Sequence, residues 1–238
     1  AFVKFCAKDS FSSCSYHWFK KIPRDMIYEI KDMPLSAAEY CFGDEEKNFF
    51  LLVLLRHLFY NKPSMKPGQT PLVLIFSTSY LPDAGGAEIA IDEITKRIPS
   101  IHFVILTARY DNALPRFEQQ GNREIIRLGI GTRFDKWLLP LFGFFAARRY
   151  ITLSAPRLLW GVMISQASLA ALFLKKVYPK IPLLVTLQEG DSPEYLQRAR
   201  FGLIYFFWKH ILKAADHVTV ISRYLETQAR DAGYDKDI

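Results

Sequence analysis

Three short segments of the sequence combine residue types that could bind a polar ligand. The first, STSYLPDAGGAE at residues 77–88, places Gly85 and Gly86 between an apolar run and an amphipathic run. Glycines at a strand-to-helix turn let the backbone approach a ligand closely, and the following helix presents unpaired N–H groups to an anion. Gly85, Gly86 and Glu88 are therefore candidate contacts, although a tight turn that binds nothing would also use two glycines.

The glycine segment departs from two familiar phosphate-binding patterns. It lacks the third glycine of GxGxxG and an acidic residue placed for a dinucleotide ribose. It also lacks the Lys-Ser/Thr pair of a Walker P-loop. Neither a dinucleotide site nor a P-loop is predicted.

The second and third segments each follow an apolar run. TLQEGDSPEYL clusters Gln188, Glu189 and Asp191, which could bind sugar hydroxyls, act as acid and base, or hold a cation. Asp191 could instead do no more than cap a helix that begins at Pro193. In ADHVTVISRYL, Ser222 follows a strand, and its hydroxyl is expected to cap the next helix.

The elements that must position these segments alternate between strand and helix after Met65. We expect strands at residues 72–77, 102–107, 124–128, 158–163, 183–187 and 217–221, and helices at 87–97, 136–150, 166–177, 193–215 and 223–232. The helix at 136–150 should be disturbed by Pro140 and Gly143. Several strands are continuous apolar runs, as in parallel sheets covered on both faces. The pattern predicts an α/β, Rossmann-like, doubly wound domain with a mainly parallel sheet over residues 65–238. The three polar segments would then share the edge at the carboxyl ends of the strands.

Residues 1–64 show no sustained periodicity. We interpret them as an uncertain N-terminal extension, either upstream readthrough or a poorly ordered segment, with Met65 as the natural start. The alternative is a genuine helical extension around residues 49–60. Because the three cysteines, Cys6, Cys14 and Cys41, match no zinc pattern, we expect free thiols, a reducing compartment and a cytoplasmic protein. No metal or other cofactor is expected.

Composition and charge indicate the class of partner. The chain has 238 residues, is 50% hydrophobic and carries a net charge of +7, which suits phosphates, nucleotides or an anionic membrane face. Two segments, 134–150 and 201–213, combine bulky aromatics with Lys and Arg, as in helices that lie at a membrane interface. Their aromatic faces could instead pack on the sheet. No nucleic-acid motif is present, and no run is long enough to span a bilayer.

Taken together, the segments resemble the N-terminal domain of family-4 glycosyltransferases, retaining enzymes of the GT-B fold. The matching pieces are LVLIFSTSYLPDAGGAEIAIDEITKRI, IPLLVTLQEGD and AADHVTVISRYLETQARDAGY, which occur in the family's order. The resemblance implies a cytoplasmic enzyme, with the inner face of the cell membrane as one location for it. It would move a sugar from a nucleotide-sugar donor to a glycan, lipid-linked or polyol acceptor without a metal. Gly85 and Gly86 would offer N–H groups to the donor diphosphate or the acceptor.

Two departures from the family pattern bear on the site. Many members have a histidine at the position of Gln188, and an amide can hydrogen-bond a hydroxyl but cannot titrate near neutrality. The chain ends before the family's donor-binding C-terminal domain, so we expect the catalytic residues in that domain and an inactive fragment. Two alternatives remain open: a GT-B-like sugar-nucleotide epimerase, and a non-catalytic module that binds membrane surfaces.

Overall fold

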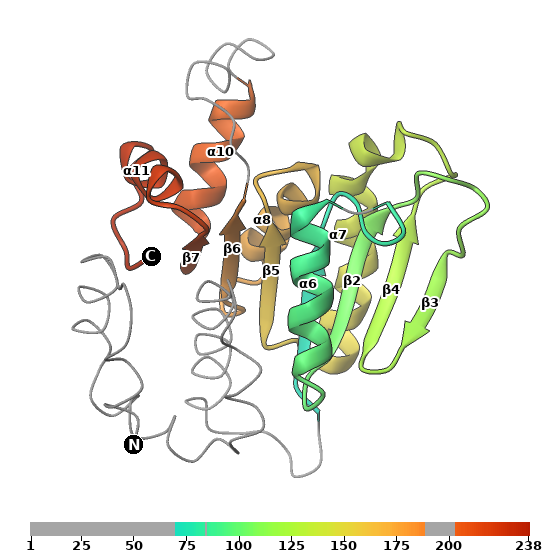
Figure 1. Cartoon of the computed structure of the whole chain (residues 1–238). Coiled ribbons are helices and arrows are strands. Elements are labelled where there is room, and N and C mark those ends of the chain that lie inside the picture. The colour runs from blue at the N-terminus through green and yellow to red at the C-terminus, as the bar shows by residue number, and fades with distance from the viewer. Residues whose placement is uncertain (1–69, 84, 189–202) are drawn as a thin grey trace, which may run out of the picture. The chain divides into compact units, whose positions relative to one another are not determined.

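A computed structural model describes residues 70–83, 85–188 and 203–238 (Figure 1). Within these residues the strands are β1 Leu72–Phe76, β2 His102–Ala108, β3 Phe117–Gln120, β4 Arg123–Leu128, β5 Leu158–Val162, β6 Leu183–Leu187 and β7 His217–Val220. The helices are α6 Gly86–Arg97, α7 Asp135–Ser154, α8 Gln166–Val177, α10 Leu203–Ala214 and α11 Arg223–Asp231. The alternation confirms the predicted Rossmann-like α/β fold.

The strands form one seven-stranded sheet in the order β3-β4-β2-β1-β5-β6-β7. All neighbours are parallel except β3, which runs antiparallel to β4 at the edge. In the central register, Val73 of β1 lies opposite Phe103 of β2 and Leu158 of β5. Because the chain leaves β1 toward β2 and later returns to β5 on the other side, the strand order reverses between β1 and β5. This is the point where open α/β sheets bind ligands.

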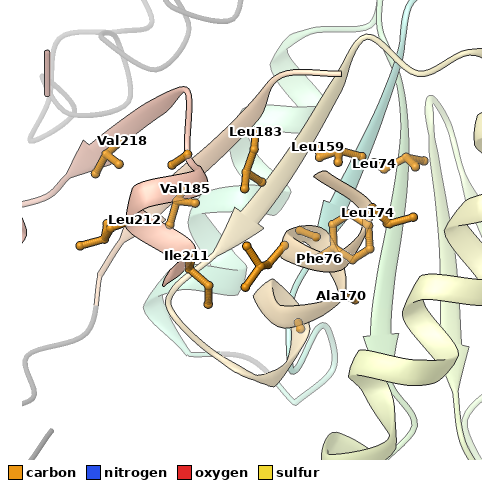
Figure 2. Close-up of a cluster of buried hydrophobic side chains, with 14 of the residues drawn as sticks. Leu74, Phe76, Leu159, Ala170, Leu174, Leu183, Val185, Ile211, Leu212 and Val218 are labelled. Carbon is orange, nitrogen blue, oxygen red and sulfur yellow. The ribbon is translucent and has the colours of Figure 1, made fainter. Parts of the chain in front are cut away.

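Helices cover both faces of the sheet. Figure 1 shows α6 in front of the sheet and α7 and α8 behind it. Strand residues alternate accordingly: Val73 and Ile75 pack with Ile91 of α6, whereas Leu74 and Phe76 belong to the cluster on the other face. That second cluster continues through α8 to Ile211 of α10 and on to β7 (Figure 2).

Several sequence predictions need correction or extension. Strand β3 was not predicted, because its sequence FEQQ is polar and partly exposed, as an edge strand can be. Helix α7 was expected to be disturbed by Pro140 and Gly143, yet it runs without a break from Asp135 to Ser154. The predicted helix at 193–215 is confirmed for α10, and its earlier part lies outside the described residues, as do residues 1–64.

Candidate functional site

The glycine turn connects β1 to α6 beside the point where the strand order reverses. Gly85 is the N-cap of α6, with φ −97° and ψ −168°, and Gly86 is the first helical residue. Both are exposed. The first intrahelical hydrogen bond is donated by Ile89 N to Gly85 O at 3.2 Å, so the N–H groups of Gly86, Ala87 and Glu88 have no intrahelical acceptor. The turn therefore presents backbone donors at the helix end that favours negative charge.

Glu88 holds the turn from within α6. Its Oε2 accepts a hydrogen bond from Gly85 N at 2.8 Å, and its Oε1 accepts one from Ser79 Oγ at 2.7 Å. The Glu88 side chain is buried by these contacts. Of the two predicted glycine donors, Gly85 N–H is thus already engaged by a carboxylate, and Gly86, which is exposed, has the N–H without an intrahelical acceptor.

A cluster of buried polar side chains connects the same turn to the sheet. Tyr80 donates its hydroxyl proton to Asp92 Oδ1 at 3.1 Å, and Arg123 of β4 donates to the same carboxylate oxygen. Arg127, also on β4, donates to Leu81 O at 2.7 Å. Burial, together with the negative charge of Asp92, raises the pKa of Tyr80, which keeps its hydroxyl protonated as a donor. Four contacts, at residues 79, 80, 81 and 85, therefore preorganise the turn.

A neighbouring loop after β4 is fixed by Asp135 at the start of α7. Asp135 Oδ2 accepts from Gly131 N at 2.8 Å and from Thr132 N at 3.0 Å. Burial alone would raise the pKa of Asp135, but the N–H donors of Thr132, Gly131 and Ile130 outweigh it and lower the pKa. The loop holds Arg133 near Tyr110, whose pKa is raised mainly by burial and further by the charges of Asp83 and Glu88. Arg133 acts in the opposite direction on that pKa, so cationic and anionic groups both border the turn.

A second polar chain supports the predicted segments after β6 and β7. Trp160 Nε1 of β5 donates to Thr186 Oγ1 of β6 at 2.9 Å, and Thr219 Oγ1 of β7 donates to the same oxygen at 2.9 Å. These buried bonds fix the carboxyl ends of three neighbouring strands relative to one another. Gln188 follows directly after β6, two residues beyond Thr186.

Ser222 behaves as predicted at the start of α11. Its Oγ accepts a hydrogen bond from Leu225 N at 3.3 Å, which confirms the helix cap. Its contact with a substrate remains a prediction. Glu189 and Asp191 lie outside the described residues.

The predicted site residues lie at three separate positions along the edge formed by the carboxyl ends of the strands. Gly85, Gly86 and Glu88 form one unit. Gln188 follows β6, which lies two positions away from β1 in the sheet, about 10 Å at the usual strand spacing. Ser222 follows the next strand, about 14 Å from β1. All five lie at the same edge, so one extended ligand could span them, but they do not surround a single small group.

Sequence reasoning missed the residues that support the glycine turn. Asp92 lies within the predicted helix at 87–97 but was not singled out, and neither were Arg123 and Arg127. No local signal could have found them, since Asp92 and Arg123 are separated by 31 residues in the chain.

A cleft of about 440 Å³ opens at the carboxyl end of β4. Its lining consists of Arg116, Ile126, Arg127, Leu128, Gly129, Ile130 and Phe142. The cleft lies beside α7 and away from Gly86, yet Arg127 belongs to its wall and also binds Leu81 O of the glycine turn. The cleft and the glycine turn therefore share Arg127.

Over 70–83, 85–188 and 203–238, no three His, Cys, Asp or Glu side chains gather where they could hold a metal ion. In the same part of the chain, no helix has the length and apolar character needed to span a membrane.

Comparisons with solved structures support the fold assignment. Sucrose-phosphate synthase from Thermosynechococcus elongatus superposes with a TM-score of 0.56 at 20% identity, covering 68% of this chain and 45% of the synthase. A second structure of that synthase gives a TM-score of 0.51 at 18% identity, covering 67% of this chain and 81% of the other. This chain thus spans less than half the length of the first synthase structure. At these identities the likeness concerns the fold alone. No curated protein was found to match the chain.

The family comparison covers most of the described sheet. A family model described as a glycosyl transferase 4-like domain matches residues 85–237, from the glycine turn to the segment after α11. That range contains the Gln188 and Ser222 segments on which the resemblance in the sequence rested. The chain belongs to the glycosyl transferase 4-like family.

Proposed function

We propose that this chain is the acceptor-side domain of an enzyme that transfers a sugar from a nucleotide-sugar donor to a glycan, lipid-linked or polyol acceptor with retention of configuration. Family membership supports glycosyl transfer in general. The nucleotide-sugar donor, the class of acceptor and the retained configuration are the proposal. No metal is assigned a role in it.

One observation carries the proposal: the fold does not require a glycine at position 86. Gly86 lies in a right-handed helix, and a Cβ built on it would have no heavy atom within 4 Å. Glycine in a helix costs roughly 0.5–1 kcal/mol relative to alanine. A glycine that the fold does not require at this exposed helix N-terminus supports a ligand that approaches the backbone.

The charge beside Gly86 suggests which part of the ligand lies there. The Glu88 carboxylate already accepts from Gly85 N, so a diphosphate pressed against this turn would meet a like charge. A sugar hydroxyl could instead accept from Gly86 N–H and donate to Glu88. We therefore assign the turn to sugar hydroxyls of the acceptor or of the donor sugar, and the diphosphate to cations elsewhere in the complete protein.

The test combines activity and stability in the complete natural protein. Gly86→Ala should leave the free energy of unfolding unchanged or raise it by up to about 1 kcal/mol. The same change should lower kcat/KM at least about tenfold, because a methyl group occupies the approach path. The assay measures nucleoside diphosphate release from UDP-glucose and GDP-mannose with polyol, oligosaccharide and polyprenyl-phosphate acceptors. Ile89→Ala, at a residue exposed on the same helix, is the matched control and should retain full activity.

The outcomes separate the alternatives. Full activity of Gly86→Ala would remove the turn from the site, and inversion at the anomeric carbon, read by NMR, would contradict retention. Isomerisation of the donor without diphosphate release would support a sugar-nucleotide epimerase. If the complete protein neither turns over nor binds a nucleotide-sugar, the alternative of a non-catalytic module that binds membrane surfaces would be supported.

A further inference from the structure

The outward face of the first half of α7 is apolar. Between residues 134 and 145, every exposed residue is a large apolar one. Together with Ile130 in the preceding loop, these residues form what we call the α7 apolar surface: Ile130, Phe134, Trp137, Leu138, Leu141, Phe142 and Phe145. Phe134 is 76% exposed, Ile130 67% and Phe145 58%. Because residues three and four apart are neighbours on a helix, the side chains adjoin one another in one patch.

The core of the domain does not need this surface. The opposite face of α7 already packs inward through Leu139, Gly143 and Ala147. Gly143 lies so close to α8 that an added Cβ would be 3.1 Å from Ala170 Cβ. A helix that is apolar on both faces is normally covered on both. Exposed contiguous apolar patches of this kind mark interaction sites.

Basic residues border the α7 apolar surface, and the acidic residue of this part of the sequence is buried. Arg133, Lys136, Arg148 and Arg149 lie in or beside the helix. Between residues 130 and 154 the sequence contains one acidic residue, Asp135. Its side chain is buried and accepts from the N–H groups of Gly131 and Thr132. Within residues 130–154 the exposed charge is therefore entirely positive.

Helix α10, the other segment with an interfacial pattern, is arranged differently. Trp208, Ile211 and Leu212 are buried in the core cluster, and Ile211 and Leu212 are visible there in Figure 2. Among the side chains of α10 that the structure describes, from residue 205 on, Phe206 is the exposed large apolar one, at 52%. The aromatic character of α10 is thus largely accounted for by packing on the sheet, and that of α7 is not.

We propose that the α7 apolar surface docks on an anionic lipid bilayer. The helix would lie in the interface plane with Phe134, Leu141 and Phe145 among the acyl chains, as amphipathic interfacial helices do. Arg133, Lys136, Arg148 and Arg149 would contact anionic headgroups. A second copy of the chain is the less suitable occupant, because an isologous contact would bring the same four cations face to face. The proposal is independent of the sugar-transfer reaction.

Vesicle flotation of the 238-residue chain tests the docking surface. The wild-type chain should float with phosphatidylcholine–phosphatidylglycerol vesicles and much less with pure phosphatidylcholine vesicles. The triple variant Phe134→Ser, Leu141→Ser, Phe145→Ser should bind at least about tenfold more weakly, since it removes the apolar contacts. Arg148→Gln with Arg149→Gln should weaken binding about fivefold per charge, only on anionic vesicles and chiefly at low salt.

The matched control is Phe206→Ser on α10, where one comparably exposed aromatic residue is removed. It should float like the wild type. Far-UV circular dichroism melts confirm that each variant folds, and the double arginine variant carries the test if the triple variant does not fold.

Three results would overturn the proposal. They are absence of wild-type flotation, flotation of the folded triple variant at wild-type levels, and equal loss in Phe206→Ser. A concentration-dependent dimer in sedimentation velocity that the triple variant dissociates, without flotation, would assign the surface to a second copy.

Discussion

Glycine residues in two loops of this domain serve different physical ends. Gly129 has φ +118°, and an added Cβ would lie 2.1 Å from Asp135 Cγ. Gly131 has φ +97°, and an added Cβ would lie 2.5 Å from Asn112 Cα. The backbone and its neighbours therefore demand glycine at both positions, and at Gly86 they do not. The sequence could not separate these cases, because each reads as a loop glycine after a strand.

Glu88 is the residue on which the conformation of the glycine turn depends. Glu88→Ala would leave Gly85 N and Ser79 Oγ without their acceptor, so the free energy of unfolding should fall by about 1–2 kcal/mol. Urea denaturation measures the loss. Glu93→Ala, on the exposed side of the same helix, removes two ion pairs at 3.5 Å and should change stability by less than about 0.5 kcal/mol. Equal effects of the two substitutions would show that Glu88 does not secure the turn.

At the scale of elements, the sequence indicated the existence of β4 but not its role. The run REIIRL was expected to contribute an apolar strand from residue 124. In the structure the strand begins at Arg123, and its two arginines are buried on the α6 face, at 7% and 3% exposure. Buried arginines need hydrogen-bond or charge partners from elsewhere in the chain, and local sequence patterns do not indicate such pairs. The polar support of the site was therefore beyond sequence reasoning.

The pair formed by Asp92 and Arg123 links α6 to β4. Arg123→Met would remove the buried cation from the Asp92 carboxylate and leave it paired with Lys96, whose side chain is 49% exposed, so the free energy of unfolding should fall by about 2 kcal/mol. Asp92→Leu should cost a similar amount. Combining the two should cost clearly less than their sum, because no unpaired charge remains. A double-mutant cycle in urea checks this, and strictly additive losses would contradict the pairing.

Helix α7 shows that residues with low helix propensity do not always interrupt a helix. Pro140 and Gly143 predicted a disturbance, but tertiary packing decides the outcome. Gly143 gives α8 room for close approach at Ala170, so the residue that weakens the isolated helix permits the contact that stabilises it. The resulting helix, Asp135–Ser154, extends beyond the predicted bounds at both ends.

At the scale of the whole molecule, alternation predicted the class of fold and the edge that carries the site. The apolar runs of β1, β2, β5 and β6 fixed their identity as buried parallel strands. The strand order did not follow from the sequence, because alternation is equally compatible with other doubly wound orders. The sequence also could not show that Gln188 and Ser222 follow strands that lie progressively farther from the glycine turn.

Acid should destabilise the domain through three carboxylates. Hydrogen bonds from Gln120 and Arg127 lower the pKa of Glu118, and for Asp92 and Asp135 hydrogen bonds to the carboxylate outweigh the opposing effect of burial on the pKa. A pKa lower in the folded state means that the unfolded chain binds more protons in acid. The stabilisation is therefore present above the unfolded pKa of about 4 and lost as pH falls below it.

The measurement is Tm by circular dichroism between about pH 7 and pH 3. We expect a steady decline below about pH 5, and a shallower one in Asp135→Asn, which lacks one of the titrating groups. A Tm that stays level down to about pH 3.5 would contradict the assignment of these carboxylates.

Three tryptophans in the described residues occupy different environments. Trp160 and Trp208 are 1% and 2% exposed, whereas Trp137 of α7 is 37% exposed. Their fluorescence should divide accordingly, with two short-wavelength emitters shielded from acrylamide and one long-wavelength emitter open to it. In a Trp18→Phe background, quenching of Trp137 would report events at α7, and the emission of Trp160 and Trp208 would report unfolding of the sheet. The chain thus carries an internal optical probe that distinguishes a local change at its surface from loss of its core.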